Sequence, residues 1–585
     1  MWIVRANMSD LSCKLEEVPE RYKTLGGRGL TSTIIYDEVD PLCHPLGPNN
    51  KLVFAPGMLT GTPAPTSARV SVGCKSPLTG GIKEANAGSA FAPDMAKMGI
   101  KALIVEGQPK DKAYWTALIS MDGDKPKVDF LPADEYTGRC LFDVYPEVFK
   151  AFGEKVDVAG IGTSGEFGYP DSGIVFQDMK KRPTRYAGRG GVGAVMGSKG
   201  LKFIVLDAAG APGVDIADEE LFKTGAKKMR DALMQHDVTK PKGGLNTYGT
   251  CVLINVMNEA GGLPTRSFRS GRFEGAAKIA GEAIFETNKA RMGKEIYNHN
   301  CSPGCIIRCS NTVYAKDGSE IASCVEYESD WSLGANCGID DLDKIAKMVH
   351  LCNAYGLDTI EAGVTIGVAM DSGLLEFGDA DGAIGLLEEM GKGTPLGRLL
   401  GMGAADVAKA FGNPRSPTVK GQAMPAYEPR AVKGIAVTYA TTTMGADHTA
   451  GYTIAPEMLG VGGTSDPLKV EMAKADLSLA FQKTTALIDS SGHCLFIAFA
   501  ILDIASGFDG FIEEINGVLG TSMTGDEAVE LGADILRRER AFNEKAGFTN
   551  ADDRLPEFMA IEPLPPHNVV SELSDELLDS VYGQL

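Results

Sequence analysis

The sequence predicts an α+β protein: an N-terminal β-rich base domain over residues 1–208, followed by two mainly α-helical domains over 209–421 and 422–585. Two observations support this prediction. The period of the apolar residues changes from strand-like to helix-like near residue 209, and Pro- and Gly-rich joints occur at 210–213 and 412–421. Apolar residues make up 44% of the 585-residue chain, which is enough to bury sizeable cores.

Four short runs rich in Ile, Val and Phe predict strands in the base domain. Clusters of Gly, Pro and Asn separate these runs, as is typical of strands joined by turns. The predicted strands lie at Trp2–Arg5, Lys51–Phe54, Ala102–Val105 and Lys202–Asp207.

Apolar residues at three- and four-residue spacing predict amphipathic helices after residue 209. The predicted helices lie at Ala217–Gln235, Leu342–Tyr355, Pro467–Asp489 and Asp526–Ala546. The second of these has Asp341 directly before its first residue and Gly356 directly after its last, as helix capping predicts.

Composition argues against several classes of protein. The net charge of −20 argues against a nucleic-acid partner, because phosphates require Lys and Arg. The longest apolar run, Cys494–Leu502, is too short to cross a bilayer. The pattern typical of a secretion signal does not appear, so we expect no such signal. Twelve cysteines in such a chain indicate reduced thiols and metal ligands, so we expect a cytoplasmic protein.

Three cysteines at four-residue spacing, with a fourth far downstream, are the most informative feature of the chain. These residues are Cys301, Cys305, Cys309 and Cys494. Pro303 and Gly304 keep the first three from forming one helical stripe. Four such thiolates can hold a cubic [4Fe-4S] cluster, which implies electron transfer. On spacing alone, a four-thiolate zinc site and buried structural cysteines stay open as alternatives.

Two glycine-rich stretches, Ser76–Gly81 and Ala187–Gly193, interrupt the predicted strands. Backbone N–H groups freed by glycine bind phosphate oxygens, although neither stretch has the pattern of a dinucleotide-binding or Walker loop. Tight turns between strands are the alternative. The nearby cations Arg69, Arg185 and Arg189 favour an anionic cofactor.

Glu328 and His448 are candidates for proton transfer. Glu328 belongs to the acidic pair with Glu326 in an otherwise apolar, small-residue stretch, and His448 lies in a loop-like segment. A carboxylate and an imidazole in dry surroundings have shifted proton affinities that suit acid–base catalysis. Taken singly, each is more simply explained as a solvated or structurally bonded residue.

Together these stretches resemble the aldehyde ferredoxin oxidoreductase family, whose members use tungsten bound to a pyranopterin. The match runs essentially from end to end and is densest at seven ordered motifs. These motifs occupy residues 76–80, 84–88, 187–199, 326–328, 353–358, 425–430 and 489–494. The resemblance implies that the β-rich base domain carries the cofactor and that the two helical domains cover it.

The resemblance implies three bound groups: a tungsten or molybdenum bispyranopterin, one [4Fe-4S] cluster, and an Mg²⁺ ion that links the pterin phosphates. The residues implied at the phosphates and Mg²⁺ are Arg69, Asn86, Gly88, Arg185 and the carbonyl of Tyr186. Those implied at the pterin rings are Asn353, Asp358, Asp489 and the backbone of His493 and Cys494. The implied cluster ligands are Cys301, Cys305, Cys309 and Cys494.

By the same resemblance, Glu328 and His448 form an active-site pair that oxidises a small aldehyde to a carboxylate. His448 is expected to hydrogen-bond the carbonyl oxygen, and Glu328 is expected to take a proton from water or from the hydrated aldehyde. The electrons are expected to leave one at a time through the cluster.

Three positions depart from the family pattern. Cys301 and Cys305 are separated by one residue more than is common, and Ala450 stands where some members have a lysine that contacts a pterin. Lys347 replaces a glutamate that binds an interface iron in some members, so no interface metal is expected. These departures suggest a ferredoxin-like carrier or iron–sulfur subunit as the partner, together with a flavin subunit.

Two other functions stay open. A related branch of the family reduces the aromatic ring of acyl-CoA thioesters, and the Glu328–His448 pair favours aldehyde oxidation over that reaction. The third function is a non-enzymatic electron-transfer or zinc-stabilised scaffold subunit, which the pterin-like motifs disfavour.

Overall fold

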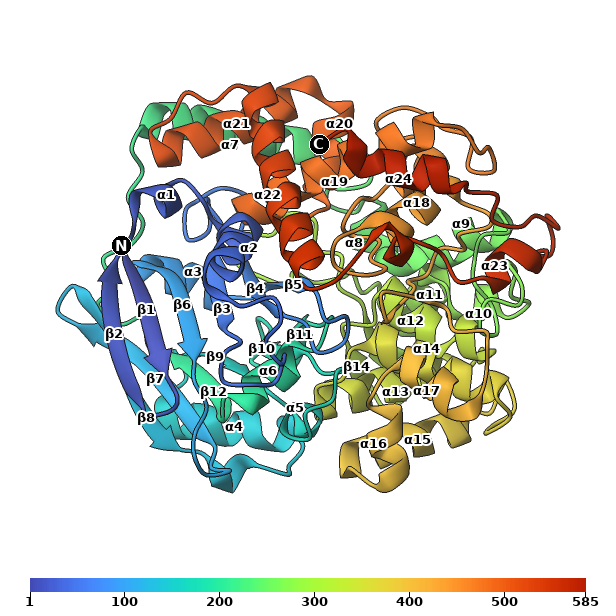
Figure 1. The fold of residues 1–585 in the computed structure, drawn as a ribbon, viewed down its shortest axis with the longest axis horizontal. Coiled ribbons are helices and arrows are strands. Elements are labelled where there is room, and N and C mark those ends of the chain that lie inside the picture. The colour runs from blue at the N-terminus through green and yellow to red at the C-terminus, as the bar shows by residue number, and fades with distance from the viewer.

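The structure, a computed structural model, describes residues 1–585 (Figure 1). All strands of its two six-stranded sheets come from residues 2–206, and helices form most of the remaining ordered elements. This arrangement confirms the predicted α+β class with its β-rich part at the N-terminus. None of the helices combines the length and the apolar character needed to span a bilayer.

The two sheets are mostly antiparallel, with one parallel pair in each, β1–β6 and β7–β12. The first sheet has the order β2 (Ser12–Glu17), β1 (Trp2–Asn7), β6 (Ile100–Glu106), β3 (Leu52–Pro56), β4 (Arg69–Lys75) and β5 (Ile82–Gly88). The second has the order β11 (Pro183–Ala187), β10 (Ile174–Gln177), β9 (Asp157–Gly160), β12 (Leu201–Leu206), β7 (Trp115–Asp122) and β8 (Lys125–Pro132). The four predicted strands correspond to β1, β3, β6 and β12.

The alternation of side chains along each strand explains how the sheets are layered. Phe54 on β3 faces the second sheet and shares one apolar core with Phe176 on β10. Val53, the preceding residue, faces the opposite way and packs under α2 (Gly27–Glu38). The outer face of the second sheet is covered by α4 (Leu141–Phe152). Between the two sheets lie α3 (Phe91–Lys97) and α6 (Val192–Ser198), whose side chains join the shared core. The layers therefore run helix, sheet, helix, sheet, helix.

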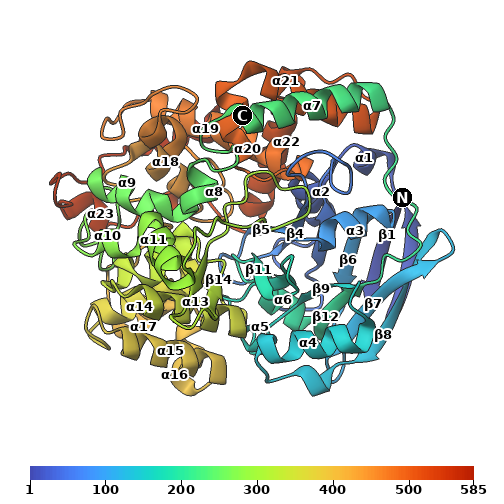
Figure 2. The ribbon, with the colours of Figure 1, turned by 180° about the vertical axis from the view of Figure 1, so that it is seen from behind.

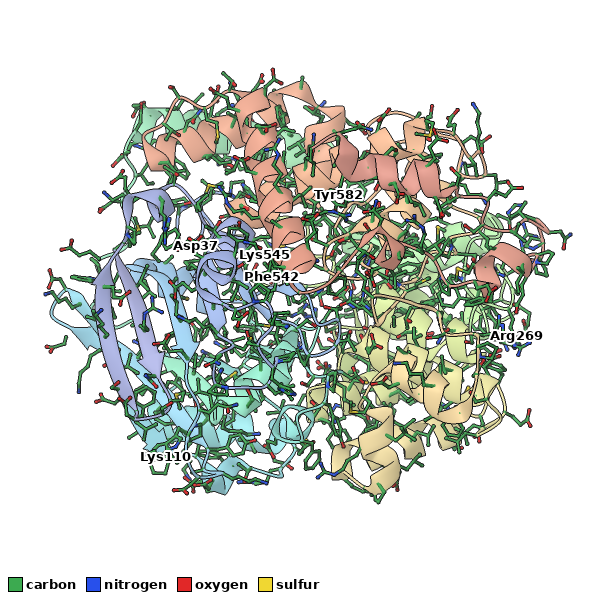
Figure 3. All side chains as sticks on the ribbon, viewed as in Figure 1. Asp37, Lys110, Arg269, Phe542, Lys545 and Tyr582 are labelled. Carbon is green, nitrogen blue, oxygen red and sulfur yellow. The ribbon has the colours of Figure 1, made fainter.

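A helix from the far end of the sequence covers α2. Phe542 of α22 (Gly525–Lys545) joins the core beneath α2. The Nζ atom of Lys545, labelled beside Phe542 in Figure 3, lies 4.6 Å from the centre of the Tyr36 ring. The base domain is therefore closed by C-terminal residues.

Most of the helical part of the chain shares one apolar core that extends from Phe222 to Met559, and α18 (Lys433–Thr441), α19 (Ala473–Ser491) and α22 also pack in a smaller second core. Within the larger core, α7 (Glu219–Gln235) packs lengthwise against α21 (Ala505–Leu519), and the two helices lie side by side in Figures 1 and 2. The first helix after the base domain thus contacts the last third of the chain. The division into domains at 209–421 and 422–585 stays a prediction.

The structure contains all four predicted helices, as α7, α13 (Leu342–Tyr355), α19 (Ala473–Ser491) and α22. The Asp341 side chain caps α13 by accepting from two backbone N–H groups, and Gly356 ends this helix in the left-handed conformation. The prediction for α19 was wrong at its start, which was placed at Pro467. The carbonyl oxygen of Pro467 accepts instead from the backbone N–H of Lys433 at 2.8 Å, so this segment is held as a loop.

Four shorter helices position the site. They are α12 (Tyr327–Leu333), α14 (Thr359–Asp371), α18 (Lys433–Thr441) and α20 (Ile497–Asp503).

Candidate functional site

A deep cavity of about 390 Å³ lies where the base sheets meet the helices. Every residue predicted for the site except His493 lines this cavity. These lining residues are Arg69, Asn86, Gly88, Arg185, Tyr186, Cys301, Cys305, Cys309, Glu328, Asn353, Asp358, His448, Asp489 and Cys494. The structure therefore brings together residues from strands, loops and helices that are hundreds of positions apart in the sequence.

The four candidate cysteines line one end of the cavity. The segment that bears the first three is not helical, and Gly304 has a φ of +72°, as the Pro303–Gly304 pair predicts. Thr66 joins this segment to the fourth cysteine. Its backbone N–H donates to the Gly304 carbonyl at 3.1 Å, and its own carbonyl accepts from the Cys494 N–H at 3.0 Å. No sequence signal pointed to Thr66.

Two arginines, the half-buried Arg69 and the buried Arg185, lie beside the cysteines. Arg69 Nη1 donates to Asn86 Oδ1 at 2.7 Å, and Arg69 Nη2 donates to Cys494 Sγ at 3.4 Å. Arg185 donates to Ser310 Oγ at 2.5 Å. The Nε atoms of both arginines are buried and have no hydrogen-bond partner. Buried donors normally have partners, so these two are available to an anionic group in the cavity.

The thiolate form is favoured at Cys301, whereas the hydrogen bond with Cys301 raises the pKa of Cys305 and burial raises the pKa of Cys309. A hydrogen bond from Cys305 lowers the pKa of the Cys301 thiol, and the charges of Arg185 and Arg69 lower it further. Gly88 lies directly against this thiol, because a Cβ there would be 3.0 Å from Cys301 Sγ. Only glycine lets β5 approach the cysteine so closely. No group of three or more His, Cys, Asp or Glu side chains is close enough to bind a single metal ion.

Two similar helix ends border the cavity. Helix α13 ends at Gly356 and α19 ends at Gly492, both in the left-handed conformation. A carboxylate predicted to contact a pterin ring lies close to each turn: Asp358 follows Gly356, and Asp489 precedes Gly492. Asp358 caps α14 by accepting from the Ile360 N–H at 3.1 Å, and Asp489 lies 3.4 Å from Arg28 Nη1.

His493 is the one predicted residue that does not line the cavity. Its imidazole is fully buried and faces away, with Nε2 3.0 Å from Glu514 Oε2 on α21. The prediction concerned its backbone, and the adjacent Cys494 does line the cavity.

Glu328 and His448 both line the cavity, and their side chains are in contact. His448 Nε2 lies 3.3 Å from Glu328 Oε1, and Glu328 Oε2 accepts from the Ala426 N–H at 2.9 Å. Burial raises the pKa of Glu328 to about 8 and lowers the pKa of His448 to about 4. At neutral pH the contact is therefore between an uncharged carboxyl and an uncharged imidazole. His448 Nδ1 has no partner in the chain and is available to a ligand.

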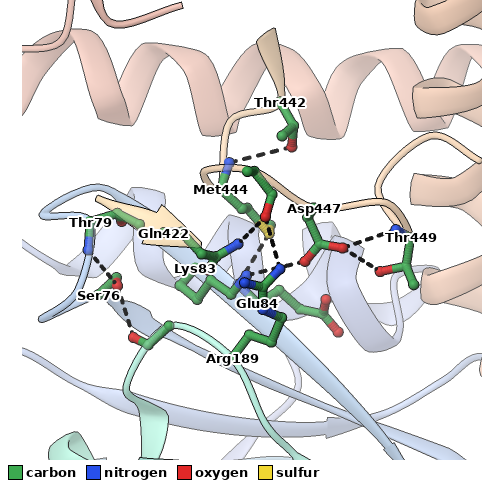
Figure 4. A network of polar contacts seen from close by, with 12 residues as sticks. Ser76, Thr79, Lys83, Glu84, Arg189, Gln422, Thr442, Met444, Asp447 and Thr449 are labelled. Atoms are coloured by element: carbon green, nitrogen blue, oxygen red, sulfur yellow. Dashed lines mark hydrogen bonds and ion pairs between the residues drawn. The ribbon is translucent and has the colours of Figure 1, made fainter. Parts of the chain in front are cut away.

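Charged side chains line the same cavity as this pair, and Figure 4 shows Lys83, Arg189 and Asp447 among them. Lys83 Nζ lies 3.6 Å from Asp447 Oδ2, and Arg189 Nε lies 3.3 Å from Asp358 Oδ2. Burial opposes ionisation of Asp447, yet Lys83 and Arg189 hold the pKa of this carboxyl well below its usual range. The residue before His448 is thus ionised while His448 itself is neutral.

Sequence reasoning missed several residues that shape the cavity. Arg28 is fully buried and forms a bidentate salt bridge with Glu539, in which Nε donates to Oε1 at 2.9 Å and Nη2 donates to Oε2 at 2.8 Å. Its setting in the Gly-rich stretch 26–29 is the signal that could have found it. Tyr427 and Tyr452 flank His448, with ring centres 5.6 and 6.1 Å from the imidazole.

Comparisons with known proteins agree along the whole chain. Residues 3–208 match the family model for the N-terminal domain of aldehyde ferredoxin oxidoreductase, and residues 224–585 match the model for its domains 2 and 3. The tungsten-containing aldehyde ferredoxin oxidoreductase of Pyrococcus furiosus is 37% identical, over 96% of this chain and 91% of the relative. The enzyme of the same description from Thermococcus kodakarensis is also 37% identical, with the same coverage.

Two more distant proteins also match this chain. A P. furiosus protein described as an aliphatic sulfonate oxidoreductase, WOR-like subunit, is 25% identical over 93% of this chain and 86% of its own length. The active-site complex BamBC of benzoyl coenzyme A reductase, solved with a dienoyl-CoA, matches with a TM-score of 0.81 at 19% identity. That match covers all of this chain and 93% of the solved chain, and it shows the fold. On the family models and the identities together, this chain is an oxidoreductase that belongs to the aldehyde ferredoxin oxidoreductase family.

Proposed function

We propose that this protein oxidises aldehydes to carboxylates at a tungsten bispyranopterin and passes the electrons through one [4Fe-4S] cluster to a ferredoxin-like carrier. The observation on which this rests is one cavity lined by both the Glu328–His448 pair and the four cysteines. Proton transfer and electron transfer would then occur within a single buried site.

The residues around the cavity fit the proposed groups. The partnerless Nε atoms of Arg69 and Arg185 suit pterin phosphates, with Gly88 leaving room beside them. We assign Asn86 and the Tyr186 carbonyl to the phosphates and their Mg²⁺. Asparagine and carbonyl oxygens are hard ligands that suit this ion.

The pterin rings and the cluster are assigned to the remaining lining residues. For the rings these are Asn353, Asp358, Asp489 and the His493–Cys494 backbone. For the cluster they are Cys301, Cys305, Cys309 and Cys494. The lowered pKa of Cys301 supports a thiolate ligand.

In the overall reaction an aldehyde and water give a carboxylate, three protons and two electrons. When bound, the tungsten pterin would accept the electron pair, and the cluster would release it singly. His448 Nδ1, which has no partner in the chain, would hydrogen-bond the carbonyl oxygen and stabilise its developing negative charge. Glu328, in its carboxylate form, would take a proton from the water or the hydrated aldehyde.

The Glu328→Gln variant tests this role. Glutamine keeps the size of the side chain and its contact with the Ala426 N–H, but it cannot accept the proton. We expect kcat with an aldehyde to fall by about 10²- to 10⁴-fold, which is the usual contribution of a general base. Tungsten and iron analysis of the same sample is the control, because both metals should be retained. Normal turnover at full metal content would contradict the role.

Ring reduction of an aromatic acyl-CoA is the second candidate, and the solved benzoyl-CoA reductase complex has the same fold. The Glu328–His448 pair favours aldehyde oxidation. Aldehyde-dependent viologen reduction and thioester-dependent dye oxidation, measured on one preparation, separate the two reactions.

The carrier is proposed to bind over the cysteine segment. Gly304 and Arg308 are exposed there, and the Arg308 N–H lies 3.5 Å from Cys305 Sγ. A partner that covers this surface would come close to the proposed cluster.

A further inference from the structure

A second, smaller cavity of about 130 Å³ adjoins the site, and its walls are almost entirely apolar. It lies between α19, α20 and the segment 452–455. Its lining residues are Tyr452, Ala455, Ala480, Phe481, Thr484, Thr485, Ile488, Leu495, Phe496, Ala498, Phe499 and Leu502. None of them is charged, so the cavity offers nothing to an ion or a phosphate.

This apolar cavity lies directly beside the main one. Tyr452, Leu495 and Phe496 line both cavities. A series of ring contacts leads from one to the other: His448 to Tyr452 at 6.1 Å, Tyr452 to Phe499 at 6.5 Å, and Phe499 to Phe496 at 5.8 Å. The shared wall therefore places the apolar cavity next to the part of the main cavity that His448 and Tyr452 line.

Two of the three polar side chains on the wall, Tyr452 and Thr484, already have hydrogen-bond partners. The Tyr452 hydroxyl lies 2.9 Å from the Tyr427 hydroxyl, and Thr484 Oγ1 donates to the Ala480 carbonyl at 3.0 Å. With these groups satisfied, the wall presents aromatic faces and methyl groups. A dry apolar cavity of about 150 Å³ binds benzene, so a cavity of this size suits one aromatic ring.

We propose that the apolar cavity binds the side arm of the substrate and selects aldehydes with a flat, aryl substituent over short aliphatic ones. This proposal rests on the proposed aldehyde oxidation and adds the substrate class. The carbonyl would lie against His448 and Glu328, and the ring would lie between Phe481, Phe496 and Phe499. Edge and face contacts among aromatic rings stabilise such an arrangement beyond simple burial.

The Ala480→Phe variant tests the proposal, with Ala473→Phe as its matched control. Both alanines are exposed and lie on α19, but only Ala480 lines the apolar cavity. For holoenzyme of each form, kcat/KM is measured with benzaldehyde and with acetaldehyde. One methylene in an apolar pocket changes such values by about 10- to 200-fold, so we expect the benzaldehyde-to-acetaldehyde ratio to fall at least tenfold in Ala480→Phe.

The control variant should keep the ratio of the unmodified enzyme. Thr484→Phe fills the cavity from a second position and should lower the ratio as Ala480→Phe does. Titration calorimetry with benzoate adds a readout that does not depend on turnover, and its affinity should fall in both filled variants but not in the control. An unchanged ratio and unchanged benzoate affinity in both filled variants would overturn the apolar-cavity proposal alone. If the metal-loaded, unmodified enzyme oxidises neither aldehyde, the proposed function itself fails.

Discussion

At the scale of single residues, burial determines the chemistry of the site. An exposed glutamate and histidine would be charged and uncharged, respectively, at neutral pH, whereas burial favours the uncharged form of both here. The sequence indicated Glu328 and His448 as candidates but not their protonation, because protonation depends on how much of each group the surrounding helices remove from water.

The raised pKa of Glu328 predicts how activity depends on pH. The carboxylate is the form that accepts a proton, and its population rises with pH until the pKa of about 8 is passed. We expect kcat/KM to rise about tenfold per pH unit between pH 6 and 7.5 and to level off above pH 8. His448, whose pKa is about 4, stays neutral over this range, so its titration does not change the kcat/KM profile.

The measurement is a kcat/KM profile from pH 6 to 9 with an aldehyde and an excess of dye. The residual activity of Glu328→Gln, which has no group to titrate at this position, is the control and should be flat. A flat profile for the unmodified enzyme would show that Glu328 is not the base.

At the scale of elements, two helices end in the same way at the cavity. Gly356 and Gly492 both turn the chain in the left-handed conformation, and a carboxylate lies close to each turn, Asp358 after the first and Asp489 before the second. The sequence already contained this likeness, as a shared polar–x–x–Gly–x–polar frame at 353–358 and 489–494. It did not reveal that the two frames border one cavity.

The Gly492→Ala variant should damage the cysteine end of the site. Gly492 has a φ of +90°, and a Cβ there would overlap Thr60 Oγ1 and lie 3.0 Å from Gly57 Cα. Backbone strain and overlap together should destabilise the protein by about 1–3 kcal/mol and displace Cys494. We expect a lower unfolding temperature and a lower iron content per chain.

Gly293→Ala is the matched control, since Gly293 has a φ of +69° and no atom within 4 Å of its added Cβ. It should cost about 1 kcal/mol from conformation alone and leave the iron content unchanged. Equal iron content in both variants would argue against a cluster held by Cys494.

At the scale of the whole molecule, the cysteine segment lies where the buried site comes close to the surface. Arg308 is exposed and forms no ion pair, in a chain whose net charge is −20. A local positive charge beside the proposed cluster would attract an acidic carrier, while the rest of the surface would repel it.

The Arg308→Glu variant tests this surface. Reversing the charge replaces attraction with repulsion, so we expect the KM for a low-potential acidic ferredoxin to rise by about tenfold at low salt. The rate with an uncharged quinone acceptor should not change. Lys110→Glu is the control, because Lys110 is exposed on the base domain (Figure 3) and does not line the cavity. Equal effects of the two variants on the KM would rule out a specific contact at Arg308.

The sequence by itself determined four of the strands, four of the longer helices and which residue types carry chemistry. Period, capping and turn residues are local, so they predicted β1, β3, β6, β12 and α13 closely. Only the tertiary structure decided how distant segments meet: Thr66 joins Gly304 to Cys494, and Arg28 pairs with Glu539. The position of the cavity, the proton affinities in it and the apolar space beyond Tyr452 all follow from packing between segments far apart in sequence, which no local pattern encodes.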